Sequence, residues 1–163
     1  MAEITVLESK LGECMGLAMA AQTATEKVKR LANGERELVR VLDQMNKEAA
    51  QTERRCKEAA ESMDGRKTAI AQKARETKKE AGEMMSAYLG RGSDALDGFE
   101  FLTMAEAGEL GHWEILEVLA KRAGERRVAA LAREIKAIQK KHVELTRRGS
   151  LQLAESEDPN EPA

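Results

Sequence analysis

The stretch EITVLESKLGECMGLAMAAQTATEKVKRLA, residues 3–32, repeats apolar or small side chains at alternating spacings of three and four residues. This spacing puts them on one face of an α-helix. The face consists of Ile4, Leu7, Leu11, Cys14, Ala18, Ala21, Thr25, Val28 and Ala32. Residues 35–63 repeat the pattern through Leu38, Val41, Met45, Ala49, Thr52, Cys56, Ala59 and Met63. Two long helices, each with one buried face, are therefore expected at the start of the chain.

Turn-forming residues divide the chain further, because glycine ends helices. Breaks are expected at Asn33-Gly34, Asp64-Gly65, Gly90–Ser93 and Ala123-Gly124. They separate five helices at residues 3–32, 35–63, 66–89, 94–122 and 125–153, with Ser93 or Asp94 as the N-cap of the fourth. Four of these helices match in length at about 43 Å. The expected fold is all-α, a four-helix bundle in one domain over residues 1–153.

The helix at 66–89 has two interpretations. It is poorer in large apolar groups than its neighbours, and its length suits a crossover that sets helix 94–122 parallel to helix 35–63. The three-four repeat also continues through Gly65, so residues 35–89 alternatively form one helix that projects as a coiled-coil arm. The crossover is the preferred interpretation.

Composition limits the function. Charged residues make up 34% of the 163, only two Phe, one Tyr and one Trp are present, and the net charge is −2. No stretch has the length of about 20 apolar residues that a membrane span needs, and no signal peptide is evident, so a cytoplasmic protein is expected. The acidic residues 154–163 are expected to be disordered. The Ala- and Met-rich helix faces suggest a homo-oligomer.

Three ionisable side chains fall on expected core faces. Glu109 and His112 lie near the centre of the apolar sector of helix 94–122, and His142 interrupts the apolar stripe of helix 125–153. A buried ionised Glu costs several kcal/mol unless a cation or hydrogen bonds compensate it. Folding the chain back at Gly124 sets Glu106 level with His142, and His112 level with Glu134. These residues are candidate metal ligands.

Residues 100–114, EFLTMAEAGELGHWE, and residues 138–142, IQKKH, resemble the second helical hairpin of ferritin-like proteins. The resemblance is to the broad superfamily of rubrerythrins and bacterial stress-related ferritin-like proteins, over about residues 94–155. That superfamily holds a dinuclear iron or manganese site in the bundle core, using one Glu from each of two helices and Glu-x-x-His from each of the other two. Oxidation of ferrous iron by oxygen or peroxide is the chemistry that the resemblance implies.

The resemblance implies a role for each candidate. Glu106 or Glu109 supplies the lone carboxylate, and His112 and His142 supply imidazoles. Glu134 and Gln139 are supporting or weak ligands, although Gln139 stands where the family has a carboxylate. Glu53 begins Glu53-Arg-Arg-Cys56, in which cysteine replaces histidine. The ligand set is thus incomplete, which leaves a degenerate site, a mononuclear site or a different register of the first hairpin open.

Two other interpretations need no metal. His142 and His112 are alternatively buried histidines that hydrogen-bond Glu106 and Glu134, in a non-enzymatic helical scaffold that oligomerises. Residues 121–148 hold ten Lys or Arg against three Glu, a charge that suits an acidic partner. Nucleic acid is not expected as that partner, because no aromatic side chains are interleaved for base stacking.

Overall fold

The computed structural model describes residues 3–162 and is all-α. Its five helices are α1 (Val6–Leu31), α2 (Arg36–Glu61), α3 (Lys67–Tyr88), α4 (Ala95–Ala123) and α5 (Arg126–Ala154). Each lies within about three residues of its expected bounds. Asp94 caps α4 as expected, and its side chain accepts a hydrogen bond from the Asp97 backbone N–H. Gly124 ends α4 in the left-handed conformation, with φ of 74°, a region that glycine enters without steric cost.

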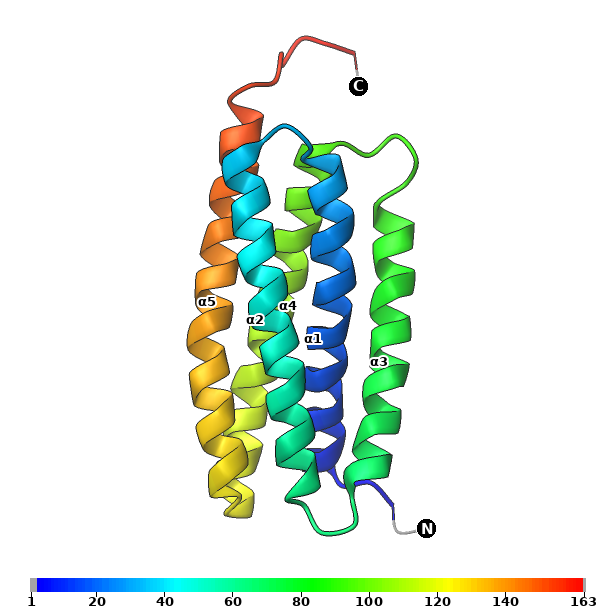
Figure 1. Ribbon diagram of the computed structural model, residues 1–163, viewed down its shortest axis with the longest axis vertical. Helices are drawn as coiled ribbons and strands as arrows, with labels where there is room; N and C mark the ends of the chain where they lie inside the picture. Colours follow the sequence, from blue (N-terminus) through cyan, green and yellow to red (C-terminus); the bar gives the residue numbers. More distant parts are fainter. Residues whose placement is uncertain (1–2, 163) are drawn as a thin grey trace.

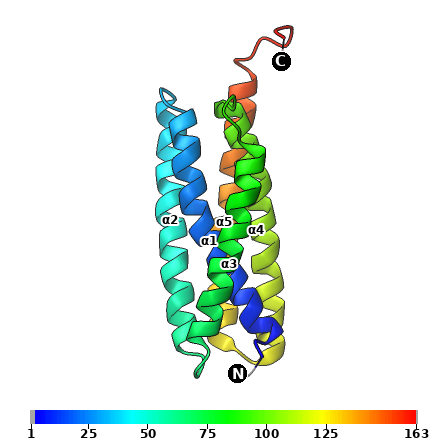
Figure 2. The same ribbon diagram turned by 90° about the vertical axis from the view of Figure 1, so that its right-hand side faces the viewer.

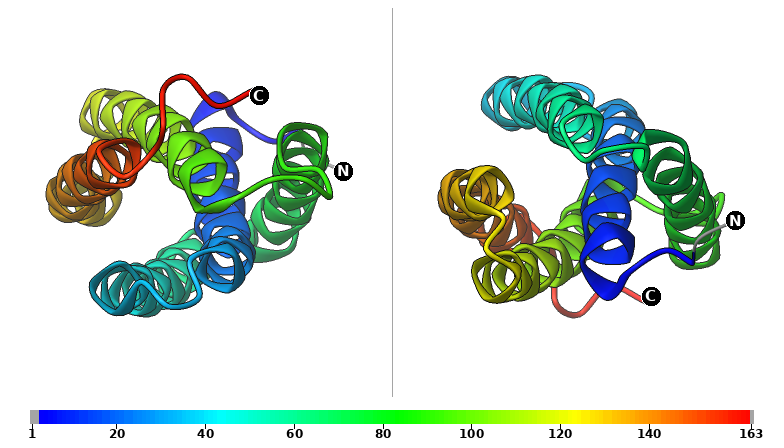
Figure 3. Two further views of the ribbon diagram at one scale, coloured as in Figure 1. Left: turned by 90° about the horizontal axis from the view of Figure 1, so that it is seen from above. Right: turned by 90° about the horizontal axis from the view of Figure 1, so that it is seen from below.

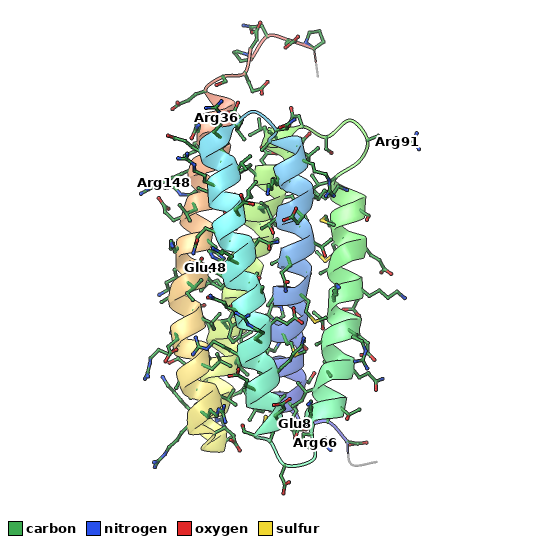
Figure 4. All side chains as sticks on the ribbon, viewed as in Figure 1. Glu8, Arg36, Glu48, Arg66, Arg91 and Arg148 are labelled. Atoms are coloured by element: carbon green, nitrogen blue, oxygen red, sulfur yellow. The ribbon has the colours of Figure 1, made fainter. Side chains whose placement is uncertain are left out.

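The preferred crossover is confirmed and the continuous coiled-coil arm is wrong. The chain turns between α2 and α3 at residues 62–66, where Gly65 has φ of 70°. α3 then runs back along the bundle, so α4 starts at the end where α2 started and runs parallel to it (Figure 1). Arg66 fixes this turn, because its guanidinium donates to both carboxylate oxygens of Glu8 on α1 at 2.8 Å. Figure 4 shows Glu8 and Arg66 together at this end of the molecule.

α1 is the central helix of the bundle and contacts α2, α3 and α4 (Figure 3). α5 packs along α4 and also contacts α2, whereas α3 lies against α1 on the side away from α5 (Figures 2 and 3). The core has two apolar clusters, one around Trp113 and the other around Phe99, and both side chains are fully buried. Between them lies the polar group described below.

Close contact between α1 and α3 depends on two glycines. A Cβ added at Gly12 would lie 2.7 Å from Lys73 Cβ, and one added at Gly16 would lie 2.4 Å from the Ala74 carbonyl oxygen. The α3 backbone therefore approaches α1 at a distance that only glycine permits.

Two further expectations concern the ends and the surface. Within residues 3–162, none of the helices is both long and apolar enough to cross a membrane. Residues 155–162 follow α5 as exposed turns. Disorder of the tail stays a prediction for these residues, and Ala163 lies outside the described part of the chain.

Gly16→Ala should destabilise the protein by about 1–3 kcal/mol, because the new methyl group would overlap the α3 backbone. Gly82→Ala is the matched control, since nothing lies within 4 Å of a Cβ at this helical glycine; it should stabilise the protein by about 0.5–1 kcal/mol. Urea unfolding of both variants measures the difference. Equal stabilisation by the two substitutions would show that α3 does not pack on Gly16.

Candidate functional site

Three helices bring polar side chains together in the middle of the core. Glu106 on α4 and His142 on α5 lie at equal sequence distance from Gly124, so the tight hairpin sets them opposite each other. Glu48 comes from α2, on the side that faces α5 (Figure 4). Glu106 and His142 are each 2% exposed. The sequence-based expectation that Glu106 stands level with His142 is confirmed.

The imidazole of His142 bridges two carboxylates. Its Nε2 lies 2.6 Å from Glu48 Oε2, and its Nδ1 lies 3.3 Å from Glu106 Oε2. Gln139, one helical turn before His142, donates its amide N–H to the same Glu106 oxygen at 2.8 Å. Both ring nitrogens can donate only when the imidazole is protonated. The arrangement therefore favours an imidazolium between two carboxylates.

Electrostatics support the same charge state. Burial lowers the pKa of His142, but the hydrogen bonds and charges of Glu106 and Glu48 outweigh burial and raise the pKa above its ordinary value. Burial raises the pKa of Glu48, yet hydrogen bonds from Gln44 and His142 leave it below its usual range. Glu48 is thus ionised at neutral pH, and the two carboxyl groups favour the charged form of His142.

Glu109 lies one helical turn beyond Glu106 and is 5% exposed. Its Oε1 accepts a hydrogen bond from the Trp113 indole N–H at 3.4 Å. Burial, together with the negative charge of Glu106, raises the pKa of Glu109 well above its usual range. Burial and the neighbouring Glu106 thus favour the protonated form of Glu109.

His112 is not part of this group. It is only half-buried, with 37% of its side chain exposed, and its Nδ1 lies 3.2 Å from both Lys10 Nζ and Glu13 Oε2 on α1. Burial and the charge of Lys10 lower its pKa, so the ring is neutral. The expected position at the centre of the buried face is wrong, because α1 packs against the flank of α4 that carries His112. The alternative hydrogen bond from His112 to Glu134 is wrong for the same reason.

Glu134 and Glu53 also lie away from His142. Glu134 is exposed and pairs with Arg55 across the α2–α5 surface. Glu53 accepts a hydrogen bond from Gln22 on α1 at 2.6 Å and pairs with Lys57. The structure therefore brings together Glu106, Glu109 and His142 of the six predicted ligands.

Glu48 is the group that sequence reasoning missed. It lies on the flank of the α2 stripe, three residues after the buried Met45, where surface charges are common. The only sequence signal that Glu48 faces the core is its position four residues before the buried Thr52, because residues four apart lie on the same side of a helix. Gln139 was expected beside the site and is found there.

These residues do not fit a dinuclear metal centre. Among residues 3–162, no three His, Cys, Asp or Glu side chains are grouped so that they could hold a metal ion. Both nitrogens of His142 already contact carboxylates, and His112 faces α1. Cys56, at the histidine position of α2, is fully buried in the apolar cluster around Trp113, and burial raises the pKa of its thiol.

Comparison with protein-family models, with curated proteins and with solved structures finds no match to this chain.

The raised pKa of His142 predicts a pH dependence of stability. Its stabilisation is fully present below the unfolded pKa of about 6.5 and is lost as pH rises through the folded pKa. His112 acts in the opposite direction, because its folded pKa is lowered. Glu109 acts in the same direction as His142. The His112→Gln, Glu109→Gln double variant therefore isolates His142.

The free energy of unfolding of that double variant should fall between pH 6 and pH 8, by roughly 1.4 kcal/mol for each pKa unit of the His142 shift that lies in this window. Urea unfolding at fixed ionic strength measures it. A free energy that stays constant or rises over the same window would contradict an imidazolium at His142.

Proposed function

We propose that the protein is a non-enzymatic helical scaffold that associates with a second copy of itself through the outer face of α4. A stripe of exposed side chains along this helix supports the proposal. It begins at Glu100, ends at Arg122 and carries Met104, Ile115 and Val118, which are 47%, 49% and 57% exposed. Gly108 and Gly111 lie in its middle, and nothing lies within 4 Å of a Cβ at either position.

The α4 stripe is complementary to itself. Glu100 and Arg122 are equally distant in sequence from Gly111, as are Met104 and Val118. Two antiparallel copies that cross at Gly111 therefore bring Glu100 of one copy to Arg122 of the other. They also bring Met104 to Val118, while the glycines let the backbones approach. Such an isologous contact closes as a dimer with twofold symmetry.

The side chains that usually carry chemistry favour a scaffold over an enzyme. Cys14 and Cys56 are free and buried, and burial raises the pKa of both thiols, so they are poor nucleophiles. Both ring nitrogens of His142 contact carboxylate oxygens, so neither nitrogen is free to exchange a proton with a substrate. Free buried thiols also suit the reducing cytoplasm, the location that we propose.

Sedimentation velocity should show a concentration-dependent dimer. A contact of two helices is smaller than a standard interface, so dissociation in the micromolar range is expected. Ile115→Lys should abolish the dimer by placing two like charges near the crossing. Leu151→Lys is the matched control, because Leu151 is 54% exposed on α5, outside the stripe. A dimer that survives Ile115→Lys would contradict the α4 contact.

Exchange of charges tests the antiparallel register. Glu100→Arg should weaken the dimer about tenfold or more, and Glu100→Arg combined with Arg122→Glu should restore it, because the pair meets across the twofold axis. Failure of the double variant to restore association would contradict this register.

A second candidate function is the binding of one iron or manganese ion by Glu106, Glu109 and His142 with Glu48. Within residues 3–162, neither Glu106 Oε1 nor Glu109 Oε2 has a hydrogen-bond donor. Carboxylate oxygens that are not occupied by donors are favourable ligands for a hard divalent cation. No three of these side chains are grouped to hold an ion as they stand among residues 3–162, so binding would require them to move and His142 to separate from one of its carboxylates.

Anaerobic titration with ferrous iron separates the two candidates. A mononuclear site predicts one tight equivalent, lost in Glu109→Gln and retained in His112→Ala. A scaffold with a metal-free core predicts no tight equivalent in any of these proteins. Two equivalents would contradict both interpretations and indicate a dinuclear centre.

A further inference from the structure

A cavity of about 130 Å³ lies between α1, α3 and α4. Small apolar side chains form most of its wall, together with a few larger ones. They include Ala21 and Ala24 from α1, Ala81 and Met85 from α3, and Leu102 and Ala105 from α4. The cavity is separate from the α2–α5 side of the core, since neither of those helices contributes to its wall.

The packing of α3 explains why this space exists. Gly12 and Gly16 hold the first half of α3 at backbone contact with α1. In the second half, small residues of α3 face Ala20, Ala21 and Ala24 of α1, but the helices do not close on one another. A Cβ at Gly82 would meet nothing within 4 Å, so the gap is left unfilled.

The inner end of the cavity is acidic. Glu106 and Glu109 both line it, and both are at least nine-tenths buried. Glu106 Oε2 accepts from Gln139 and contacts His142, and Glu109 Oε1 accepts from Trp113. The other oxygen of each carboxyl group has no donor within the described residues. Among the described residues only Thr77 Oγ1 is both fully buried and without a partner, so these two carboxyl oxygens are open to the cavity and a donor placed there can reach them.

We propose that this cavity binds a small aliphatic amine in its ammonium form, with the ammonium at Glu106 and Glu109 and the hydrocarbon against the alanines. An ammonium carries three donors and one positive charge, so it can hydrogen-bond both carboxyl groups and its charge favours the ionised form of Glu109, which no neutral group does. An apolar protein cavity of about 150 Å³ holds one benzene. The occupant therefore has about five or six non-hydrogen atoms.

On α3, one charged residue lines the cavity: Lys78, whose side chain is exposed. The rival occupant that this position allows is a small carboxylic acid, whose anion would pair with Lys78 while its hydrocarbon tail fills the cavity. The two acids at the inner end disfavour that rival only weakly if the anion stays at the mouth. The amine and the acid therefore have to be compared directly.

The test uses three probes with the same hydrocarbon: 3-methylbutylamine, 3-methylbutan-1-ol and 3-methylbutanoate. Calorimetric titration of the full chain at pH 7.5, with EDTA to exclude metal ions, should show the amine binding at least tenfold more tightly than the alcohol. Lys78→Ala should leave amine binding unchanged or tighten it. Equal affinities for amine and alcohol, or tighter binding of the acid that is lost in Lys78→Ala, would overturn the proposal.

Variants locate the probe. Glu109→Gln should reduce the preference for the amine to less than threefold, whereas Glu117→Gln should retain it, because Glu117 is buried on the α5 side of the same helix and pairs with Lys136. Ala105→Leu and Ala81→Leu fill the cavity from two helices and should each weaken binding at least tenfold. If Glu109→Gln does not fold, the two leucine variants decide. Unchanged binding in either one, when folded, would overturn the site.

Discussion

The charge on His142 is the constraint on which the core depends. Its ring contacts Glu48 on α2 at 2.6 Å and Glu106 on α4 at 3.3 Å, and it is 2% exposed. Separating such a buried charge from its partners costs about 3–5 kcal/mol. A neutral ring would lose its hydrogen bond to one of the two carboxyl groups, and that group would be left with its other donors, among them Gln139 for Glu106 and Gln44 for Glu48. The packing of α5 against α2 and α4 therefore depends on the protonation of His142.

The raised pKa of Glu109 depends on the same group of buried charges. His142 contacts both Glu48 and Glu106, and an ionised Glu109 one turn from Glu106 would be unfavourable. Its raised pKa is the response to burial and to Glu106. The cavity on the α3 side gives this carboxyl group a mainly apolar surrounding. The buried polar side chains thus face two environments: His142 and Gln139 on the α5 side, and the cavity on the α3 side.

Much of the fold could be predicted from the sequence, because helix bounds depend on local signals such as Asp94 and Gly124. The contact of Glu106 with His142 was also predictable, since a tight hairpin fixes which residues stand level. The neighbours of His112 and Glu48 were not. A helical repeat gives the angle of a side chain around its own helix, but which helix lies at that angle depends on Gly12, Gly16 and the central position of α1. For this reason the predicted ligands His112, Glu134 and Glu53 lie apart.

The charge state of His142 can be observed directly by ¹⁵N NMR of its ring nitrogens, with His142→Gln to assign the signals. Across a pH titration, both nitrogens of His142 should keep the shifts of a protonated imidazole to a pH above the ordinary pKa of about 6.5, whereas His112 should become neutral below it. A titration midpoint of His142 at or below about 6.5 would contradict the account, because a neutral ring cannot donate to both carboxyl groups.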